Sequence, residues 1–210
     1  VVVFAEADAD TAAKMTAAFK YRNAGQVCIS PTRFFAHDAV YDRFVSTFVD
    51  YAKNLKVGDG LDADTKMGPL ANNRRVDAMD KFITDAAERG AKIQTGGKRI
   101  GNQGYFYQPT VLTDVPDSAR IMNEEPFGPV AVIQRFKDFD DVIKRANRLP
   151  FGLASYAFTK SAKSATAVAD QLDQGMVTIN HFGLALPETP FGGIKDSGYA
   201  HAGGVEGLRA

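Results

Sequence analysis

The stretch from residue 130 to residue 158, VAVIQRFKDFDDVIKRANRLPFGLASYAF, decides the fold. It opens on an apolar run at 130–133, which has the composition of a strand buried on both faces. A helical segment over about 138–148 follows and ends before Pro150, and residues 155–158 are extended again. A strand, a helix and a second strand in succession favour parallel pairing, with the helix crossing one face of the sheet.

The same alternation continues in both directions along the chain. Strands are expected at 1–4, 33–36, 107–115 and 176–179, a helix at 161–173, and a glycine-rich loop with a short terminal helix after residue 180. Apolar residues at helical spacing mark the inward faces of three further helices: Ala12, Met15 and Phe19; Val40, Phe44, Phe48 and Ala52; Val76, Met79, Ile83 and Ala87. The pattern predicts an α/β fold of three layers, with a mostly parallel sheet flanked by helices.

Composition limits the classes of function. The chain is 45% hydrophobic, and its 25 Lys and Arg balance 25 Asp and Glu, so its charge gives no reason to expect nucleic acid or an anionic membrane as partner. No apolar run approaches the roughly 20 residues that a membrane-spanning helix needs. A single cysteine excludes an internal disulfide and favours a reducing compartment such as the cytoplasm. No Cys/His spacing suggests a metal site.

That one cysteine, Cys28, allows two interpretations. Its apolar neighbours Val27 and Ile29 favour a small, buried and inert residue. Its position after Gly25 and Gln26, at a junction between helix and strand, instead favours a reactive thiol, since α/β folds bind ligands at such junctions. The histidines His37, His181 and His201 show no spacing that ties them to the thiol as an activating base. The residues around Cys28 leave both interpretations open.

Three ordered motifs decide between them. The segments FKYRNAGQVC (19–28), NEEPFGPV (123–130) and PFGGIKDSG (190–198) closely resemble the signatures of the NAD(P)-dependent aldehyde dehydrogenases. Further landmarks at 68–70, 107–112 and 147–153 extend the resemblance over nearly the whole chain. The residues of the first and third motifs are most similar to those of the succinate-semialdehyde dehydrogenases.

The resemblance implies covalent catalysis with NAD or NADP as cofactor. Cys28 would attack a small aldehyde to form a thiohemiacetal and then a thioester, with its backbone N–H holding the oxyanion. Glu125 would accept hydrogen bonds from the nicotinamide ribose, and Phe127 would pack beside that ribose. Phe191 would line the substrate tunnel, and Arg22 would bind the distal carboxylate of a semialdehyde, unless it forms a surface salt bridge at the helix end.

The sequence also departs from the family pattern. We expect residues 1–210 to form one thiol-bearing catalytic domain of a longer polypeptide, because the chain opens on the apolar run Val1-Val2-Val3-Phe4, as if within a buried strand. No G-x-G-x-x-G motif for a dinucleotide is present. The resemblance places the cofactor-binding domain, the general base and the oxyanion asparagine before Val1, and an oligomerisation segment after Ala210. Leu186 stands where some semialdehyde enzymes have a serine, and Ala200-His201-Ala202-Gly203 replaces a more usual Gly-Arg-Glu-Gly.

Three expectations follow from these departures. The isolated chain is expected to lack dehydrogenase activity. Its exposed surfaces are expected to associate into a homo-oligomer, through the strand near 176–180. Two other functions stay open, which are a cofactor-independent cysteine thioesterase or acyltransferase and a non-catalytic interaction module.

Overall fold

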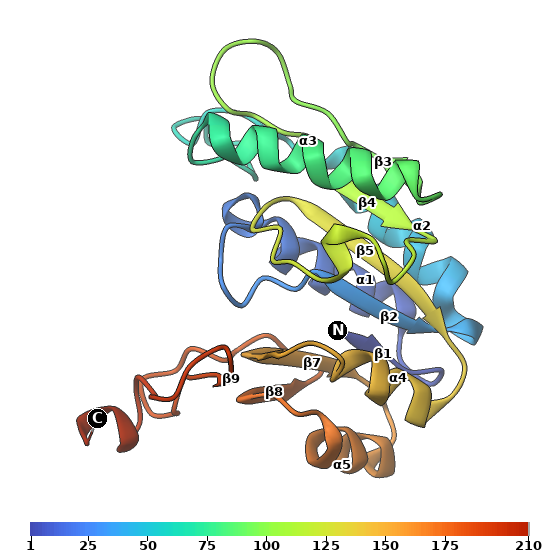
Figure 1. Cartoon of the computed structure of the whole chain (residues 1–210), viewed down its shortest axis with the longest axis vertical. Coiled ribbons are helices and arrows are strands. Elements are labelled where there is room, and N and C mark those ends of the chain that lie inside the picture. The colour runs from blue at the N-terminus through green and yellow to red at the C-terminus, as the bar shows by residue number, and fades with distance from the viewer. Residues whose placement is uncertain (210) are drawn as a thin grey trace. The chain divides into compact units, whose positions relative to one another are not determined.

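The computed structural model describes residues 1–209, so Ala210 of the expected domain lies outside the described residues. Its main sheet has seven strands in the order β3-β4-β5-β2-β1-β7-β8. The pairs β1–β2, β1–β7, β4–β5 and β7–β8 are parallel, and β3–β4 is antiparallel. The mostly parallel sheet flanked by helices confirms the predicted fold class (Figure 1).

The chain divides into two compact units. Unit 1 comprises Val1–Asp8, Phe35–Val40 and the residues from Arg135 onward, and unit 2 comprises Ala9–Phe34 and Tyr41–Gln134. No helix among the described residues combines the length and apolarity that a membrane span needs.

Unit 1 is built on parallel strands. Its strands are β1 (Val2–Val3), the end of β2 (Arg33–His37), β7 (Ala154–Phe158) and β8 (Met176–Ile179), and a small second sheet pairs β6 (Phe151–Gly152) with β9 (Ile194–Lys195). The helices are α4 (Phe139–Ala146), α5 (Ala162–Gln171) and the short η3 (Glu206–Leu208). Asp138 begins α4 by accepting a 2.9 Å hydrogen bond from the backbone N–H of Asp141.

The core of unit 1 lies between helices α4 and α5 and the strands. It consists of Val2, Phe4, Phe35, Phe136, Val142, Ile143, Ala157, Val168 and Leu172. The ring of Phe136 meets those of Phe4 and His37 edge to face, with centroids 5.8 and 5.3 Å apart. Such contacts add to the stabilisation that comes from removing apolar area from water.

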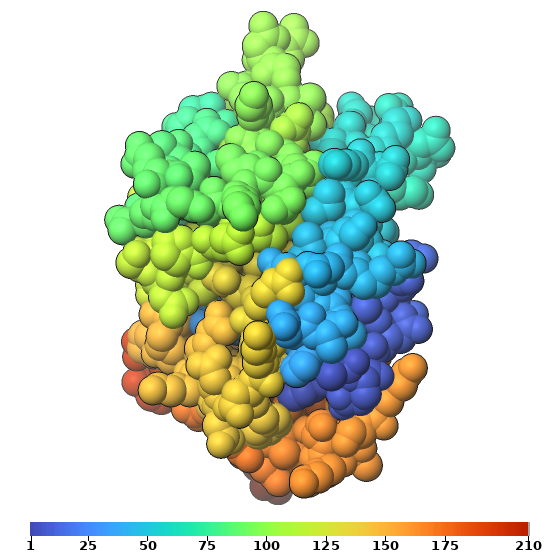
Figure 2. Space-filling model, turned by 90° about the vertical axis from the view of Figure 1, so that its right-hand side faces the viewer, coloured from blue at the N-terminus to red at the C-terminus, as the bar shows by residue number. Residues whose placement is uncertain are grey.

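Unit 2 contains the longer helices. They are α1 (Ala9–Tyr21), α2 (Asp38–Asn54, from Tyr41 onward in this unit) and α3 (Asn73–Glu88), with the short helices η1 (Arg22–Gly25) and η2 (Arg120–Met122). The strands are β3 (Lys92–Thr95), β4 (Thr110–Thr113) and most of β5 (Val130–Phe136). The exposed connection between β3 and β4 projects from the surface of the unit (Figures 1 and 2).

Helix α1 is rotated relative to the sequence-based prediction. Ala12 is buried as expected, but Met15 and Phe19 are only half-buried, while Thr16 and Lys20 are wholly buried. Thr16 is tolerated because its hydroxyl donates to the carbonyl of Ala12 at 2.6 Å. Two polar residues therefore lie on the inward face, and the apolar pattern alone missed them.

Other differences from the prediction concern helix α3 and two short strands. In α3 the buried residues include Phe82 and Ala86, whereas Ala87 is exposed. Strand β3 was not predicted because its residues are polar or exposed, as suits an edge strand, and the two-residue β9 is too short to give a periodic signal. Gly90, with φ +95°, ends the α3 segment as predicted.

Truncating the unit 1 core tests its contribution. Phe136→Ala is expected to lower the free energy of unfolding by about 3–5 kcal/mol, because it removes a buried ring that touches two others. Phe151→Ala, at a ring that is 46% exposed in the same unit, should cost far less. Urea denaturation measures both, and equal losses would contradict this description of the core.

Candidate functional site

Cys28 follows a turn of unusual backbone conformation. After α1 ends at Tyr21, the consecutive residues Asn23, Ala24 and Gly25 have φ values of 52°, 53° and 71°. Left-handed conformations are unfavourable for residues with a Cβ and persist only when the surroundings impose them. Here the Asn23 amide donates to the carbonyl of Gln26 at 3.0 Å, and the backbone N–H of Gln26 donates back to the carbonyl of Asn23 at 3.0 Å.

The turn leaves the Cys28 side chain exposed. The expectation that Cys28 is buried is therefore wrong, and it is the neighbouring Ile29 that packs into the core. Among residues 1–209, no group accepts a hydrogen bond from the backbone N–H of Cys28. An exposed thiol beside an available N–H can bond to a carbonyl carbon while the N–H stabilises the oxygen.

Gln26 anchors the turn to the segment before α3. Its Oε1 accepts a 2.8 Å hydrogen bond from the backbone N–H of Ala71, and its Nε2 donates to the carbonyl of Asn23 at 3.2 Å. The motif at 68–70 thus lies next to Ala71, whose hydrogen bond to Gln26 holds the turn that precedes Cys28.

A contact between two glycines joins the turn to the second motif. A Cβ added at Gly25 would lie 2.2 Å from the carbonyl oxygen of Gly128, so only hydrogen fits there. Gly128 is itself covered by Met79 of α3, whose sulfur would lie 2.3 Å from an added Cβ. The loop that carries Cys28 and the loop that carries Glu125 and Phe127 therefore pack backbone to backbone.

The loop of Glu125 and Phe127 is held by α3. Arg75 donates through Nη2 to the carbonyl of Pro126 and, at 3.3 Å, to that of Phe127. Phe127 has a φ of 44°, a conformation that a bulky residue adopts only when its neighbours impose it. Burial lowers the pKa of Arg75, and the Glu125 carboxylate opposes that shift.

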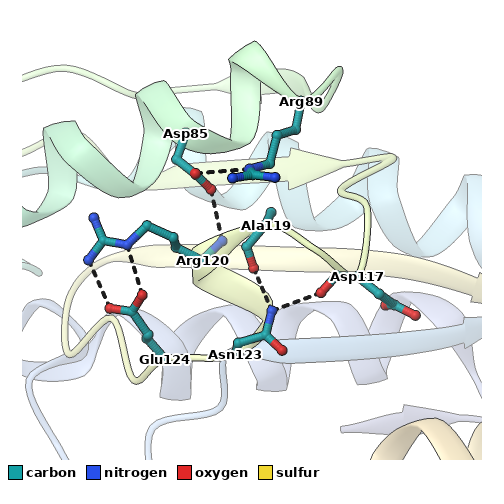
Figure 3. Close-up of polar contacts among 7 residues, drawn as sticks. All are labelled: Asp85, Arg89, Asp117, Ala119, Arg120, Asn123 and Glu124. Atoms are coloured by element: carbon teal, nitrogen blue, oxygen red, sulfur yellow. Dashed lines mark hydrogen bonds and ion pairs between the residues drawn. The ribbon is translucent and has the colours of Figure 1, made fainter.

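The adjacent acidic residues have different surroundings, as Figure 3 shows for Glu124. Both oxygens of Glu124 accept hydrogen bonds from Arg120, each at 2.8 Å, and these bonds lower the pKa of Glu124. Glu125 is exposed and makes no hydrogen bond or ion pair with any other described residue. Glu124 is thus structural, and Glu125 is the carboxylate that is available to a ligand.

The backbone around this pair is fixed by a polar network (Figure 3). Asp85 of α3 accepts hydrogen bonds from the backbone N–H of Arg120 at 2.8 Å and from Nε of Arg89 at 2.9 Å. The Asn123 amide donates to the carbonyls of Asp117 and Ala119, both at 2.8 Å. The network attaches η2 to α3 just before Glu125.

Lys20 was missed by sequence reasoning. Its side chain is buried, with 1% of its surface exposed. Burial lowers the pKa of Lys20 to about 7, and the Glu125 carboxylate acts in the opposite direction. The signal that could have revealed it is its spacing, because Lys20 lies four residues after Thr16 on the same face of α1 as Ala13 and Ala17.

The remaining predicted site residues have distinct surroundings. Arg22 is exposed, and its guanidinium stacks on the Phe19 ring 4.9 Å from the centroid. No carboxylate among the described residues pairs with it, so the surface salt bridge considered for Arg22 does not form. Phe191 belongs to unit 1, where it is half-buried and exchanges backbone hydrogen bonds of 2.6 and 2.8 Å with Ala202.

The three histidines all belong to unit 1, so unit 2 holds no imidazole that could activate Cys28. His181 accepts a 3.0 Å hydrogen bond through Nδ1 from the backbone N–H of Gly183. Among residues 1–209, no group of three or more His, Cys, Asp or Glu side chains is placed to hold a metal ion.

Comparison with known proteins gives a consistent result. The profile described as the aldehyde dehydrogenase family matches residues 1–210. A putative 4-(hydroxymethyl)benzenesulfonate dehydrogenase of Comamonas testosteroni is 43% identical over 210 residues, which are 100% of this chain and 44% of that protein. Succinate-semialdehyde dehydrogenase [NADP(+)] GabD of Escherichia coli (strain K12) is 42% identical over 207 residues, which are 99% of this chain and 43% of that protein.

Solved structures agree with the sequence matches. An E. coli NADP-dependent enzyme superposes with a TM-score of 0.96 at 42% identity, over 99% of this chain and 43% of the other. A succinate-semialdehyde dehydrogenase from Burkholderia pseudomallei gives 0.96 at 39% identity, again over 99% and 43%. The chain therefore spans less than half the length of the relatives that it matches.

The glycine contact can be tested with a matched pair of variants. Gly90→Ala forces a Cβ onto a positive φ in open space and is expected to cost about 1–2 kcal/mol. Gly25→Ala adds an overlap with the Gly128 carbonyl and should cost at least about 3 kcal/mol. Urea denaturation of both variants measures the difference, and similar losses would show that the two loops are not packed as described.

The network in Figure 3 predicts a pH dependence. Hydrogen bonds from the Arg120 backbone and from Arg89 hold the pKa of Asp85 below its ordinary value of 3.8. Its stabilising effect is therefore fully present above about pH 3.8 and is lost as the pH falls through the lower folded-state pKa. The difference in free energy of unfolding between wild type and Asp85→Asn should shrink on acidification, whereas a constant difference would exclude this role for the Asp85 charge.

Proposed function

Because the chain belongs to the aldehyde dehydrogenase family, we propose that it carries the nucleophile of an NAD(P)-dependent aldehyde dehydrogenase and that this nucleophile is Cys28. One observation supports the assignment most strongly. The exposed thiol stands on a loop that packs, through Gly25 and Gly128, against the loop of the available Glu125 carboxylate. The relatives are named as dehydrogenases, which agrees with this chemistry.

The proposed reaction begins with bond formation at sulfur. The Cys28 thiolate adds to the aldehyde carbon, and the carbonyl π electrons move to oxygen to give a thiohemiacetal anion. The backbone N–H of Cys28, which has no acceptor among the described residues, donates to that oxygen. NAD(P)⁺, whose nicotinamide ribose Glu125 and Phe127 would hold, would supply the hydride acceptor that oxidation of the Cys28 adduct to a thioester requires. Water then attacks the thioester carbon, which releases the acid and returns the thiol.

Residues of the second motif suit the cofactor. A carboxylate that accepts hydrogen bonds from ribose hydroxyls must be accessible and free of internal partners, and Glu125 meets both conditions. Phe127 follows in a backbone conformation that Arg75 stabilises through two carbonyls. The chemistry of this donor set therefore fits NAD or NADP.

We assign the substrate class as aldehydes that carry an anionic group. Arg22 is an exposed guanidinium near the thiol in sequence, and no described carboxylate neutralises it. The names of the relatives include a succinate semialdehyde and a benzenesulfonate, which are both anions. Arg22 would bind the anionic end of succinate semialdehyde or a related compound.

Two further proposals concern the cellular compartment and the oligomeric state of the enzyme. A free thiol is chemically competent only while it stays reduced, which favours a reducing compartment such as the cytoplasm. Strand β8 ends the order of the main sheet, and an unpaired strand edge favours association with another chain, as expected of a homo-oligomer.

Replacement of the sulfur tests the role of Cys28. In the whole protein, Cys28→Ala is expected to reduce NAD(P)H formation from succinate semialdehyde by on the order of 10⁴-fold or more, because the covalent step is lost. Reaction with iodoacetamide should label this chain at Cys28 alone, and aldehyde should slow that labelling. A burst of ester hydrolysis without cofactor would instead favour a thioesterase, and unchanged turnover in Cys28→Ala would overturn the proposal.

The anion-binding role is tested with a pair of substrates. Arg22→Gln should raise the KM for succinate semialdehyde by roughly 10–100-fold, in line with the loss of a charge-assisted contact, and should leave the KM for butanal almost unchanged. Lys14→Gln, at another exposed cation on the same segment, serves as the control. A similar rise in KM for both substrates would argue against anion binding by Arg22.

A further inference from the structure

Phe19 has no role in the chemistry described so far. Its spacing on α1 predicted a core residue, but its side chain is only half-buried, whereas the next residue, Lys20, is wholly buried. The Phe19 ring contacts a charged group, because the guanidinium of Arg22 lies over it, 4.9 Å from the centroid. Residues three apart on a helix surface are neighbours, so the sequence itself brings this ring and this cation together at the end of α1.

The backbone at Arg22 is fixed on both sides. The residue before it, Tyr21, is buried and donates through its hydroxyl to the carbonyl of Thr110 at 3.1 Å. The residue after it, Asn23, takes part through its amide and its carbonyl in the hydrogen-bonded turn that leads to the thiol. Because the backbone is held in this way, the Phe19 ring is the contact that sets the direction of the Arg22 side chain.

Other arginines that stack on phenylalanine rings differ from Arg22 in one respect. Two of them lie over their rings at 5.2 and 4.9 Å from the centroid, but each also engages a carboxylate. Arg120 binds both oxygens of Glu124, and Nη1 of Arg145 lies 3.5 Å from an oxygen of Asp141. The Arg22 guanidinium forms no ion pair or hydrogen bond with any described residue. Its charge and its donors are therefore available to a ligand.

An aromatic ring suits the task of holding a cation that must bind an anion. The face of the ring attracts the cation without neutralising its charge, whereas a neighbouring carboxylate would neutralise it. The N–H donors of a guanidinium lie in its plane, so a ring beneath the central carbon leaves those donors accessible at the edge. Holding the long side chain in advance also reduces the conformational entropy that is lost when the anion binds.

We propose that Phe19 is a positioning residue that determines the preference for anionic aldehydes, because its ring holds the Arg22 guanidinium ready for the anionic end of the substrate. This inference rests on the proposed role of Arg22 and adds a second residue to it. Phe19 acts through Arg22 and needs no contact with the substrate. Its effect should therefore appear in the KM for an anionic aldehyde and should leave kcat and the KM for a neutral aldehyde unchanged.

The first test compares two substrates in the whole protein. Phe19→Leu removes the ring and keeps an apolar side chain, so it should raise the KM for succinate semialdehyde about two- to fivefold, as expected for an exposed cation–π contact, with the KM for butanal unchanged. Phe19→Trp keeps an aromatic face and should retain the wild-type KM. Met15→Leu, at another half-buried residue of α1, is the control. In Phe19→Leu, an equal rise in KM for both substrates, or no rise for either, would overturn the inference.

The second test measures the coupling between the two side chains without turnover. Calorimetry gives the dissociation constant of succinate, the acid formed from succinate semialdehyde, for wild-type protein, Phe19→Leu, Arg22→Gln and the double variant. Phe19→Leu should weaken succinate binding about two- to fivefold in the wild-type background and should have no effect in the Arg22→Gln background. Equal weakening in both backgrounds would show that Phe19 acts independently of Arg22 and would overturn the inference.

The variants also separate the two proposals. A raised KM for succinate semialdehyde in Arg22→Gln, together with a wild-type KM in Phe19→Leu, would reject the role of Phe19 and leave the role of Arg22 intact. An unchanged KM in Arg22→Gln would reject anion binding by Arg22, and the inference about Phe19 with it. Circular dichroism of each variant excludes a loss of folding as the cause.

Discussion

The candidate site depends on one steric constraint, which is the contact between Gly25 and the carbonyl of Gly128. These residues are more than one hundred positions apart, yet there is no room between them for a single methyl group. The contact sets the distance between the loop of Cys28 and the loop of Glu125. Met79 of α3 covers Gly128, so α3 packs against the same contact. The thiol and the carboxylate are thereby placed by backbone packing and not by flexible side chains.

The second loop also shows how adjacent residues of one type can differ in role. Arg120 engages both oxygens of Glu124, and Asp85 fixes the backbone of Arg120. These interactions stabilise the loop and leave Glu125 exposed. A structural carboxylate next to an available one allows the loop to be rigid while it presents a charge to a ligand.

Much of this could be predicted from the sequence, because its signals are local. The apolar run at 130–133, the capping Asp138 and the stop at Gly90 predicted a strand, a helix start and a helix end that the structure confirms. The motifs also singled out Cys28 and Glu125. The burial of Lys20 and Thr16 was missed because it depends on packing from distant segments. Strand β3 was missed because edge strands carry few apolar residues.

The exposed, solitary thiol has a consequence for the behaviour of the chain under oxidative stress. Peroxide converts a reactive thiolate to a sulfenic acid, which a neighbouring thiol can trap as a reversible disulfide. This chain contains no second cysteine, so it offers no such internal trap. A small thiol such as glutathione can supply the reversible cap instead, whereas further oxidation leads to the irreversible sulfinic and sulfonic acids.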